Sequence, residues 1–281
     1  MDKTNTRNRT PSLFVLASLT AILLISSCVG CFSSKHVILS HQLKKKTFPV
    51  NSFVKIFRFI KVSKCLPISG SECRSGITFS SSGSGVILYS DKKGSLVMTA
   101  GHMCNVDVDK GRMMIEETEK SIKLLTIKNK KFDAVVIHKE VRQGTDLCML
   151  YSKKMRKHQT SKISNQAPQT GDLAYNIAAP AGIFHPPAVP LLSGYYSGYM
   201  KDSDSDMYTI PAVGGSSGSP VFNERFEIIG NIYAAATRFS HMSVSTTHKN
   251  MLKFIKTSLK IIKEKKAVKK VPSPIKDVPW F

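Results

Sequence analysis

Acidic residues are scarce in this chain, which has 19 Asp and Glu against 41 Lys and Arg and a formal net charge of +22 over 281 residues. So large a positive charge favours partners with anionic surfaces, such as phospholipid headgroups, cell-wall polymers or nucleic acid. The sequence nevertheless lacks zinc-finger spacing, an aromatic RNA-binding motif and a basic region fused to heptads. We therefore expect no dedicated recognition of nucleic acid.

Cysteine is also sparse, with six residues, and two of them lie in an apolar segment near the N-terminus. The other four include no Cys-x-x-Cys pair, the spacing that commonly anchors a zinc site. We therefore expect neither a metal nor another cofactor. These four residues are Cys65, Cys73, Cys104 and Cys148.

The N-terminus carries the pattern of a targeting segment, over residues 1–34. Basic residues precede an apolar stretch, Leu13–Ile25, which gives way to small residues. The run Ile25-Ser26-Ser27-Cys28 resembles the bacterial lipobox, in which Cys28 would be lipidated. Alternatively, the stretch continues through Phe32 and is long enough to span a bilayer as an uncleaved anchor. Both alternatives predict an exported protein attached to a membrane.

Short runs of β-forming residues alternate with turn residues from about Phe53 onward, which is typical of an all-β domain. A polar segment, Lys153–Thr170, separates two sets of runs. The first set comprises Phe53–Val62, Gly85–Tyr89, Ser95–Ala100, Ile122–Ile127, Ala134–His138 and Leu147–Tyr151, and the second comprises Leu173–Ala178, Leu191–Met200, Met207–Ile210, Pro220–Phe222 and Glu227–Ala235.

Only near the C-terminus does the pattern become helical. Residues 249–276 hold ten lysines and one glutamate, Glu264. We expect a helix whose apolar stripe packs on the second β set, with its lysine-rich face either solvated or docked on an anionic membrane surface. The stripe comprises Met251, Leu252, Ile255, Leu259 and Ile262, and the lysines are Lys253, Lys256, Lys260 and Lys263.

A Gly-rich turn at residues 214–218 leads directly into the strand-like run Pro220–Phe222. The similar segment Ser80–Gly85 is expected to be only a loop before a strand. The later turn has strand-like runs on both sides and is more tightly embedded than a linker needs to be. It suggests a serine nucleophile in this turn, with backbone N–H groups of the turn converging on the oxyanion formed during attack.

A histidine and an aspartate stand at strand ends earlier in the chain. His102 follows the apolar run Leu96–Gly101, where it is either a general base or a surface histidine. Asp146 opens the run Leu147–Leu150, where it either orients the imidazole or caps the strand. Asp133 is the rival carboxylate, and Asp107 and Asp109 are weaker ones.

The motifs Thr-Ala-Gly-His, Asp-Leu-Cys-Met-Leu and Gly-Ser-Ser-Gly-Ser-Pro, in this order, resemble the chymotrypsin-like serine proteases over residues 75–262. The bacterial branch, with the glutamyl endopeptidases and the high-temperature-requirement proteases, is the most similar. The resemblance implies an all-β fold of two antiparallel six-stranded β-barrels with the site between them. It also implies Ser217 as nucleophile, His102 as general base, Asp146 as orienting carboxylate, and the N–H groups of Gly215 and Ser217 as oxyanion hole.

Departures from the resemblance bear on specificity. Pro211 stands where trypsin-like enzymes carry an acidic residue, so the sequence gives no support for cleavage after Lys or Arg. Asn231-Ile232-Tyr233 lacks the histidine that glutamyl endopeptidases use, and no PDZ domain fits after the helix. An apolar pocket for small or aliphatic side chains is expected instead, lined by Pro211, Ala234, Ala235 and Ala236.

Four cysteines allow three pairings. Cys104 and Cys148 each lie two residues after a candidate catalytic residue, so they approach each other if those residues meet. Cys65 and Cys73 could then close a small loop. Free buried thiols are the alternative.

The sequence thus predicts an exported, membrane-attached serine endopeptidase that acts on protein or peptide substrates. Its protease domain is expected at residues 61–265, after a linker and first strand region at 35–60 and before a basic tail at 266–281. The alternative is a catalytically silent, protease-like binding module tethered to an anionic surface through its lysine-rich C-terminus.

Overall fold

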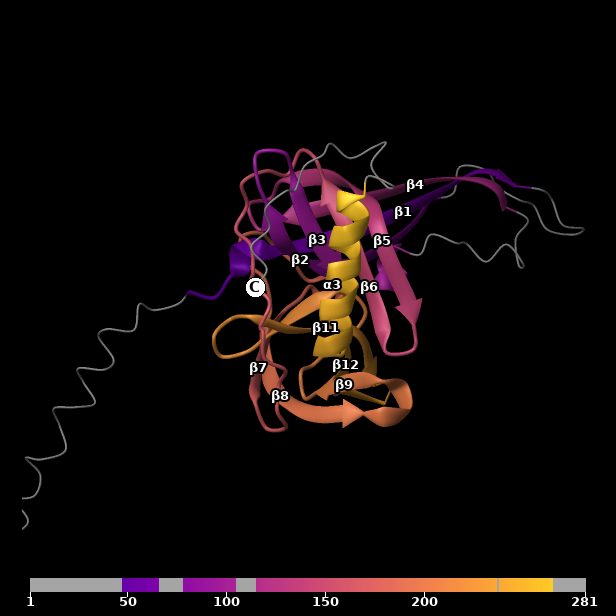
Figure 1. Cartoon of the computed structure of the whole chain (residues 1–281). Coiled ribbons are helices and arrows are strands. Elements are labelled where there is room, and N and C mark those ends of the chain that lie inside the picture. The colour runs from indigo at the N-terminus through magenta and orange to yellow at the C-terminus, as the bar shows by residue number, and fades with distance from the viewer. Residues whose placement is uncertain (1–46, 66–77, 105–114, 237, 265–281) are drawn as a thin grey trace, which may run out of the picture. The chain divides into compact units, whose positions relative to one another are not determined.

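A computed structural model of the chain describes residues 47–65, 78–104, 115–236 and 238–264. Within these ranges, twelve strands form two closed six-stranded barrels, and one α-helix follows them (Figure 1). All strand pairs within the barrels are antiparallel. The prediction of an all-β fold with two six-stranded barrels and a C-terminal helix is confirmed.

The first barrel closes in the order β1-β2-β3-β6-β5-β4. Its shortest strand, β3, is buried at all five positions, as expected for an apolar run covered on both faces. Pairing of Thr99 with Cys148 joins β3 to β6, and this register later decides which residues meet at the site. The strands are β1 (Phe53–Cys65), β2 (Thr78–Ser90), β3 (Ser95–Thr99), β4 (Ile115–Thr126), β5 (Lys131–Arg142) and β6 (Thr145–Ser152).

The second barrel closes in the order β10-β11-β12-β9-β8-β7. Its strand β12 was not among the sequence-predicted runs because serine, histidine and threonine occupy most of its positions. Three of those polar residues, Ser243, Ser245 and Thr246, are nevertheless buried against β11 and β9. The strands are β7 (Leu173–Ile177), β8 (Leu191–Met200), β9 (Ser205–Tyr208), β10 (Ser219–Phe222), β11 (Ile228–Ala236) and β12 (Phe239–Thr246).

The segment Ser80–Gly85, expected to be a loop, is instead part of β2. It pairs with β1 from Phe59↔Ser80 to Val54↔Gly85, so its backbone groups are satisfied by the ladder despite its weak strand propensity. The predicted domain boundary at residue 61 falls inside β1, so the first barrel begins upstream of that boundary.

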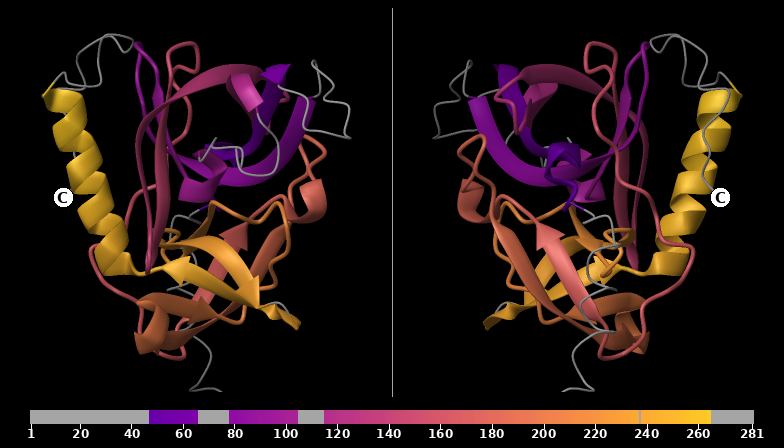
Figure 2. Two further views of the ribbon diagram at one scale, coloured as in Figure 1. Left: turned by 90° about the vertical axis from the view of Figure 1, so that its right-hand side faces the viewer. Right: turned by 90° about the vertical axis from the view of Figure 1, so that its left-hand side faces the viewer.

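Helix α3 (His248–Lys263) begins at the N-cap Thr247, whose side chain accepts a hydrogen bond from the Asn250 N–H. The prediction that it packs on the second β set was incomplete, because it contacts β5 and β6 as well as β11. Phe254 is fully buried and meets the ring of His138 on β5, with 4.9 Å between centroids. Figure 2 shows α3, in yellow, along the outer side of the first barrel.

Several sequence predictions fall on residues that the structure does not describe. They include the targeting segment 1–34 with Cys28, the Cys65–Cys73 pairing, and the basic tail 266–281. Among the described helices, none combines the length and apolarity that crossing a bilayer requires.

Candidate active site

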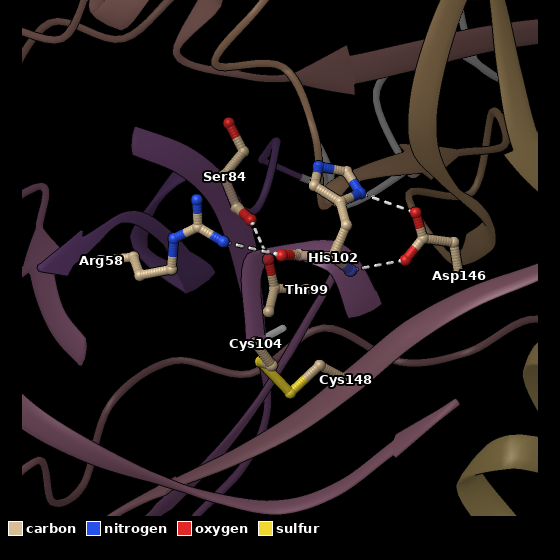
Figure 3. Close-up of a disulfide and its surroundings, with 7 residues drawn as sticks. All are labelled: Arg58, Ser84, Thr99, His102, Cys104, Asp146 and Cys148. Atoms are coloured by element: carbon tan, nitrogen blue, oxygen red, sulfur yellow. Dashed lines mark hydrogen bonds and ion pairs between the residues drawn. A yellow bond between two sulfur atoms is a disulfide. The ribbon is translucent and has the colours of Figure 1, made fainter. Parts of the chain in front are cut away.

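His102 and Asp146 are brought together by the register of β3 and β6. His102 lies on a short 3₁₀ turn, Gly101–Cys104, directly after β3, and Asp146 is the second residue of β6. His102 Nδ1 lies 2.6 Å from Asp146 Oδ2, and the His102 backbone N–H donates to Oδ1 at 2.7 Å (Figure 3). Both carboxylate oxygens therefore bind the same residue and fix the direction of the imidazole.

The surroundings of the pair shelter the carboxylate more than the ring. The Asp146 side chain is 13% exposed and that of His102 is 41% exposed. A Cβ at Gly101 would lie 2.6 Å from Asp146 Oδ1, so glycine is needed for this close approach. The Asp146 N–H donates to Thr246 Oγ1 at 3.2 Å, which connects the aspartate to β12 of the second barrel. The second ring nitrogen of His102 is left for a substrate or a nucleophile.

The rival carboxylates do not take part in this arrangement. The Asp133 side chain is 74% exposed and pairs with Lys123 at 3.8 Å on the neighbouring strand. Asp107 and Asp109 lie outside the described residues.

The turn before β10 has a backbone conformation that only glycine adopts easily. Gly215 and Gly218 have φ of +97° and +87°, and a Cβ at Gly215 would lie 2.3 Å from the Ala179 carbonyl oxygen. The Gly214 carbonyl accepts a hydrogen bond from the Ala181 N–H at 2.6 Å. Within the described part of the chain, the N–H groups of Gly215 and Ser217 have no hydrogen-bond acceptor. These two donors are available to bind an oxyanion.

The Ser217 hydroxyl has a weak partner. Its Oγ donates to the Tyr233 carbonyl at 3.4 Å, and no hydrogen bond joins it to His102 among the described residues. Catalytic hydrogen bonds are often long or absent before substrate binds. Rotation about one side-chain bond is needed to turn this hydroxyl away from Tyr233.

Ser84 connects the two halves of the site and was missed by sequence reasoning. It is fully buried, and its Oγ donates to the Gly215 carbonyl at 2.8 Å while accepting from the Ala179 N–H at 2.9 Å. Its backbone N–H donates to the Ser217 carbonyl at 2.8 Å, and its carbonyl accepts from Thr99 Oγ1 at 2.7 Å. One residue of β2 thus contacts the end of β3, from which His102 follows, and the turn that carries Ser217.

Replacing Ser84 with Ala is expected to lower kcat roughly tenfold or more with a smaller change in KM, because a displacement of the turn by about 1 Å is costly to catalysis. It should also lower the free energy of unfolding by about 1–3 kcal/mol, since a buried N–H and a buried carbonyl lose their partner. Ser82→Ala on the same strand is the matched control for both peptidase kinetics and urea denaturation. Equal effects of the two substitutions would contradict the role of Ser84.

A disulfide ties together the segments that carry His102 and Asp146. It joins Cys104 to Cys148 across 44 positions of the sequence, and both residues are buried (Figure 3). We expect Cys104→Ala/Cys148→Ala to lower the free energy of unfolding by roughly 4 kcal/mol, mostly because the unfolded chain becomes less constrained. Urea denaturation of both proteins, with and without reductant, measures this. If reductant lowers the stability of the double variant as much as that of the wild type, the effect does not come from this bond.

The predicted pocket residues lie on two segments that share a neighbour, β12. Pro211 precedes Ala212, whose N–H donates to the Ser240 carbonyl at 2.8 Å. Ala234, Ala235 and Ala236 are half-buried at the end of β11, directly after Tyr233, and pair with β12. Opposite Ala235 stands Ser243, a fully buried residue whose Oγ has no hydrogen-bond partner among the residues that the structure describes. Sequence reasoning missed Ser243 because it did not predict β12.

The second barrel also contains a buried carboxylate, that of Asp206. Burial raises the pKa of Asp206, whose Oδ1 accepts a hydrogen bond from the Tyr196 hydroxyl at 2.9 Å. Its Oδ2 accepts from the His248 backbone N–H at 3.3 Å. In the described ranges, no three His, Cys, Asp or Glu side chains gather as metal ligands would.

Comparisons with known proteins agree with this geometry. The chain matches the trypsin-like peptidase domain family over residues 83–230, more than half of its length and a span that contains His102, Asp146 and Ser217. Among solved structures it resembles the serine endoprotease from Yersinia pestis, with a TM-score of 0.53 and 17% identity, over 76% of this chain and 64% of that one. A comparison with curated protein sequences found no match.

The structural likeness establishes the fold alone at this low identity, and the chain aligns with less than two thirds of the Yersinia protein. The family match carries the assignment, because it covers parts of both barrels and each of the three candidate side chains. The chain therefore belongs to the trypsin-like peptidase domain family.

Proposed function

We propose that the protein is an endopeptidase that cleaves peptide bonds through Ser217, His102 and Asp146 by way of an acyl-enzyme. The observation that carries this proposal is the contact of both Asp146 oxygens with His102, one at the ring and one at the backbone. A carboxylate held in this way favours the tautomer with its proton on Nδ1, which leaves Nε2 as a base.

The reaction begins when Ser217 Oγ attacks the scissile carbonyl carbon and His102 Nε2 takes the hydroxyl proton. The N–H groups of Gly215 and Ser217 bind the negative oxygen of the tetrahedral intermediate. The carbon–nitrogen bond then breaks as His102 gives its proton to the leaving amine. Water repeats the sequence on the acyl-enzyme and releases the carboxylic acid product.

The edge of β11 offers a binding surface for an extended substrate. Pairing with β10 ends at Ser219↔Ile232, so residues 233–236 have β12 on one side and no described strand on the other. A peptide lying there could form main-chain hydrogen bonds as an added strand next to the Ser217 hydroxyl. The small side chains of Ala234, Ala235 and Ala236 support a preference for small or aliphatic substrate residues.

Export and membrane attachment are part of the proposal. They are supported by the basic and apolar pattern of residues 1–34 and by the lysine-rich C-terminus. A disulfide between Cys104 and Cys148 is consistent with an oxidising compartment.

Labelling with a fluorophosphonate probe tests the catalytic proposal, combined with cleavage of casein and of a peptide library by the purified full chain. We expect labelling, hydrolysis and a preference for small or aliphatic residues before the cleaved bond. Failure of the chain to label or to cleave, when it is folded, would support the catalytically silent binding module instead.

A further inference from the structure

A hollow of about 420 Å³ opens on the first barrel, and its lining is strongly basic. Two short segments provide the charge: the β4–β5 turn and the residues that follow β6. The apolar part of the lining includes Ile127 and Phe132. The basic side chains are Lys128, Lys130, Lys154, Arg156 and Lys157, with His158 beside them.

These cations are not explained by the basic composition of the chain alone. Lys and Arg account for 41 of 281 residues, but for five of the eleven that line the hollow, and none of the eleven is acidic. Within the described part of the chain, no carboxylate pairs with any of the five. Arg156 Nε donates to the Lys153 carbonyl at 3.0 Å, and the mutual repulsion of the five cations is further relieved by solvent, salt or a bound anion.

Two acidic residues next to these segments have other partners. Asp133 follows Phe132 on β5, and its carboxylate pairs with Lys123 at 3.8 Å. The Asp91 carboxylate accepts hydrogen bonds from the N–H groups of Lys93 and Gly94 at 2.7 and 3.0 Å. Neither residue lines the hollow.

The backbone that presents the second group of cations is fixed in an unusual conformation. Lys157 has φ of +53°, a left-handed conformation that lysine rarely adopts. Its N–H donates to the Asp91 carbonyl at 3.1 Å, and the next N–H, that of His158, donates to Ser90 Oγ at 2.8 Å. The segment is thereby held against the β2–β3 turn, so the cations that it carries surround the hollow before any ligand binds.

The pKa of His158 reflects its burial and the positive charge of this region. Its half-buried ring packs edge-on against Phe132, with 5.6 Å between centroids. Burial lowers the pKa of His158, and the positive charges of Lys128 and Lys130 lower it further. The imidazole therefore favours its neutral form, which can donate one hydrogen bond to an anion.

The hollow and the catalytic residues lie at opposite ends of the first barrel. In the antiparallel pair β3–β6, Thr99 next to the His102 turn faces Cys148, and Ser95 faces Ser152 at the other end. The basic segment continues from Ser152, at the end remote from His102. A ligand in the hollow therefore does not occupy the site assigned to peptide cleavage.

We propose that this hollow binds a small, multiply charged phosphate compound. Its volume is in the range of small-molecule sites, and lysine and arginine are the usual partners of phosphate oxygens. A singly charged carboxylate would leave most of the five cations uncompensated, whereas two or three phosphate groups match them in number. The same chemistry is found in free polyphosphate compounds and in phosphorylated lipid headgroups.

Isothermal titration of the full chain with inorganic tripolyphosphate, at about 0.15 M salt to screen diffuse attraction, tests the proposal. We expect saturable binding at one site, and Lys128→Ala/Lys154→Ala to weaken it at least about tenfold, since hydrogen bonds to charged groups are strong. Lys253→Ala/Lys260→Ala on the exposed face of α3 removes the same net charge and should leave the affinity within about twofold.

Absence of saturable binding would overturn the proposal, and so would an equal loss in both double variants. The second result would assign the binding to net charge and not to the hollow. Titration with inositol trisphosphate, a soluble lipid headgroup, separates the two sources of the ligand. Tighter binding than that of tripolyphosphate supports a phosphorylated lipid, and weaker binding supports a free compound. Both readouts are independent of peptidase activity.

Discussion

Ser217→Ala is expected to reduce kcat for peptide hydrolysis by about 10⁶-fold and to abolish labelling by a fluorophosphonate. The size of this reduction follows from other triad proteases, in which removing the nucleophile lowers kcat nearly as much as removing the whole triad. Structure should be preserved, because within the described ranges the hydroxyl makes a single long hydrogen bond, at 3.4 Å to the Tyr233 carbonyl. Active-site labelling and single-turnover hydrolysis by the two purified proteins provide the measurement.

The neighbouring hydroxyl offers a matched control. Ser216 is buried, and its Oγ accepts a hydrogen bond from the Val213 N–H at 3.3 Å within the same turn. Ser216→Ala should therefore retain labelling, although the turn is slightly less stable. Labelling that survives Ser217→Ala but is lost in Ser216→Ala would transfer the nucleophile to the adjacent position.

Asp146→Asn should slow turnover by about 10⁴-fold while leaving the fold intact, in line with the same substitution in other triad proteases. The geometry explains why the amide cannot replace the carboxylate. Its single oxygen can accept either from the His102 backbone N–H, now 2.7 Å from Oδ1, or from the ring, now 2.6 Å from Oδ2. If the oxygen stays at the backbone, the NH₂ group donates to Nδ1 and the ring proton moves to Nε2. The ring then has no basic nitrogen facing Ser217.

Asp133→Asn separates this mechanism from a general loss of negative charge. Asp133 is exposed and pairs with Lys123 at the surface, so its substitution should change kcat by less than about twofold. Circular dichroism and the pH dependence of kcat/KM complete the comparison. A large effect at Asp133 with none at Asp146 would reverse the assignment of the orienting carboxylate.

The candidate catalytic side chains were predictable because each lies where an apolar run meets a turn. A buried strand that ends in a small-residue turn carries its next polar residue to the barrel edge, as β3 does for His102, and Asp146 stands at the edge where the buried strand β6 begins. The two-barrel fold was predictable from the rhythm of the runs together with the order of the motifs. These runs, turns and motifs can be recognised from neighbouring residues in the sequence, without knowing which strands pair.

What the sequence could not show depends on contacts between distant segments. In the sequence, Ser84 resembles a linker residue. Its role becomes visible only in the structure, where β2 pairs with β1 and the Ser84 hydroxyl donates to the Gly215 carbonyl. β12 is polar in composition and is stabilised as a strand by its neighbours β11 and β9. The placement of α3 was incomplete for the same reason, because its apolar face is also completed by β5 and β6.

The position of α3 leads us to expect that the candidate active site is completed late in synthesis. Asn250, in its first turn, donates to the Gly144 carbonyl at 3.2 Å, immediately before Thr145 and Asp146. Both barrels precede this helix in the chain, so they leave the ribosome before the element that packs on the two of them. A nascent polypeptide that already contains all three candidate side chains still lacks this support, and we expect the segment of Asp146 to gain its final geometry only after α3 has been made.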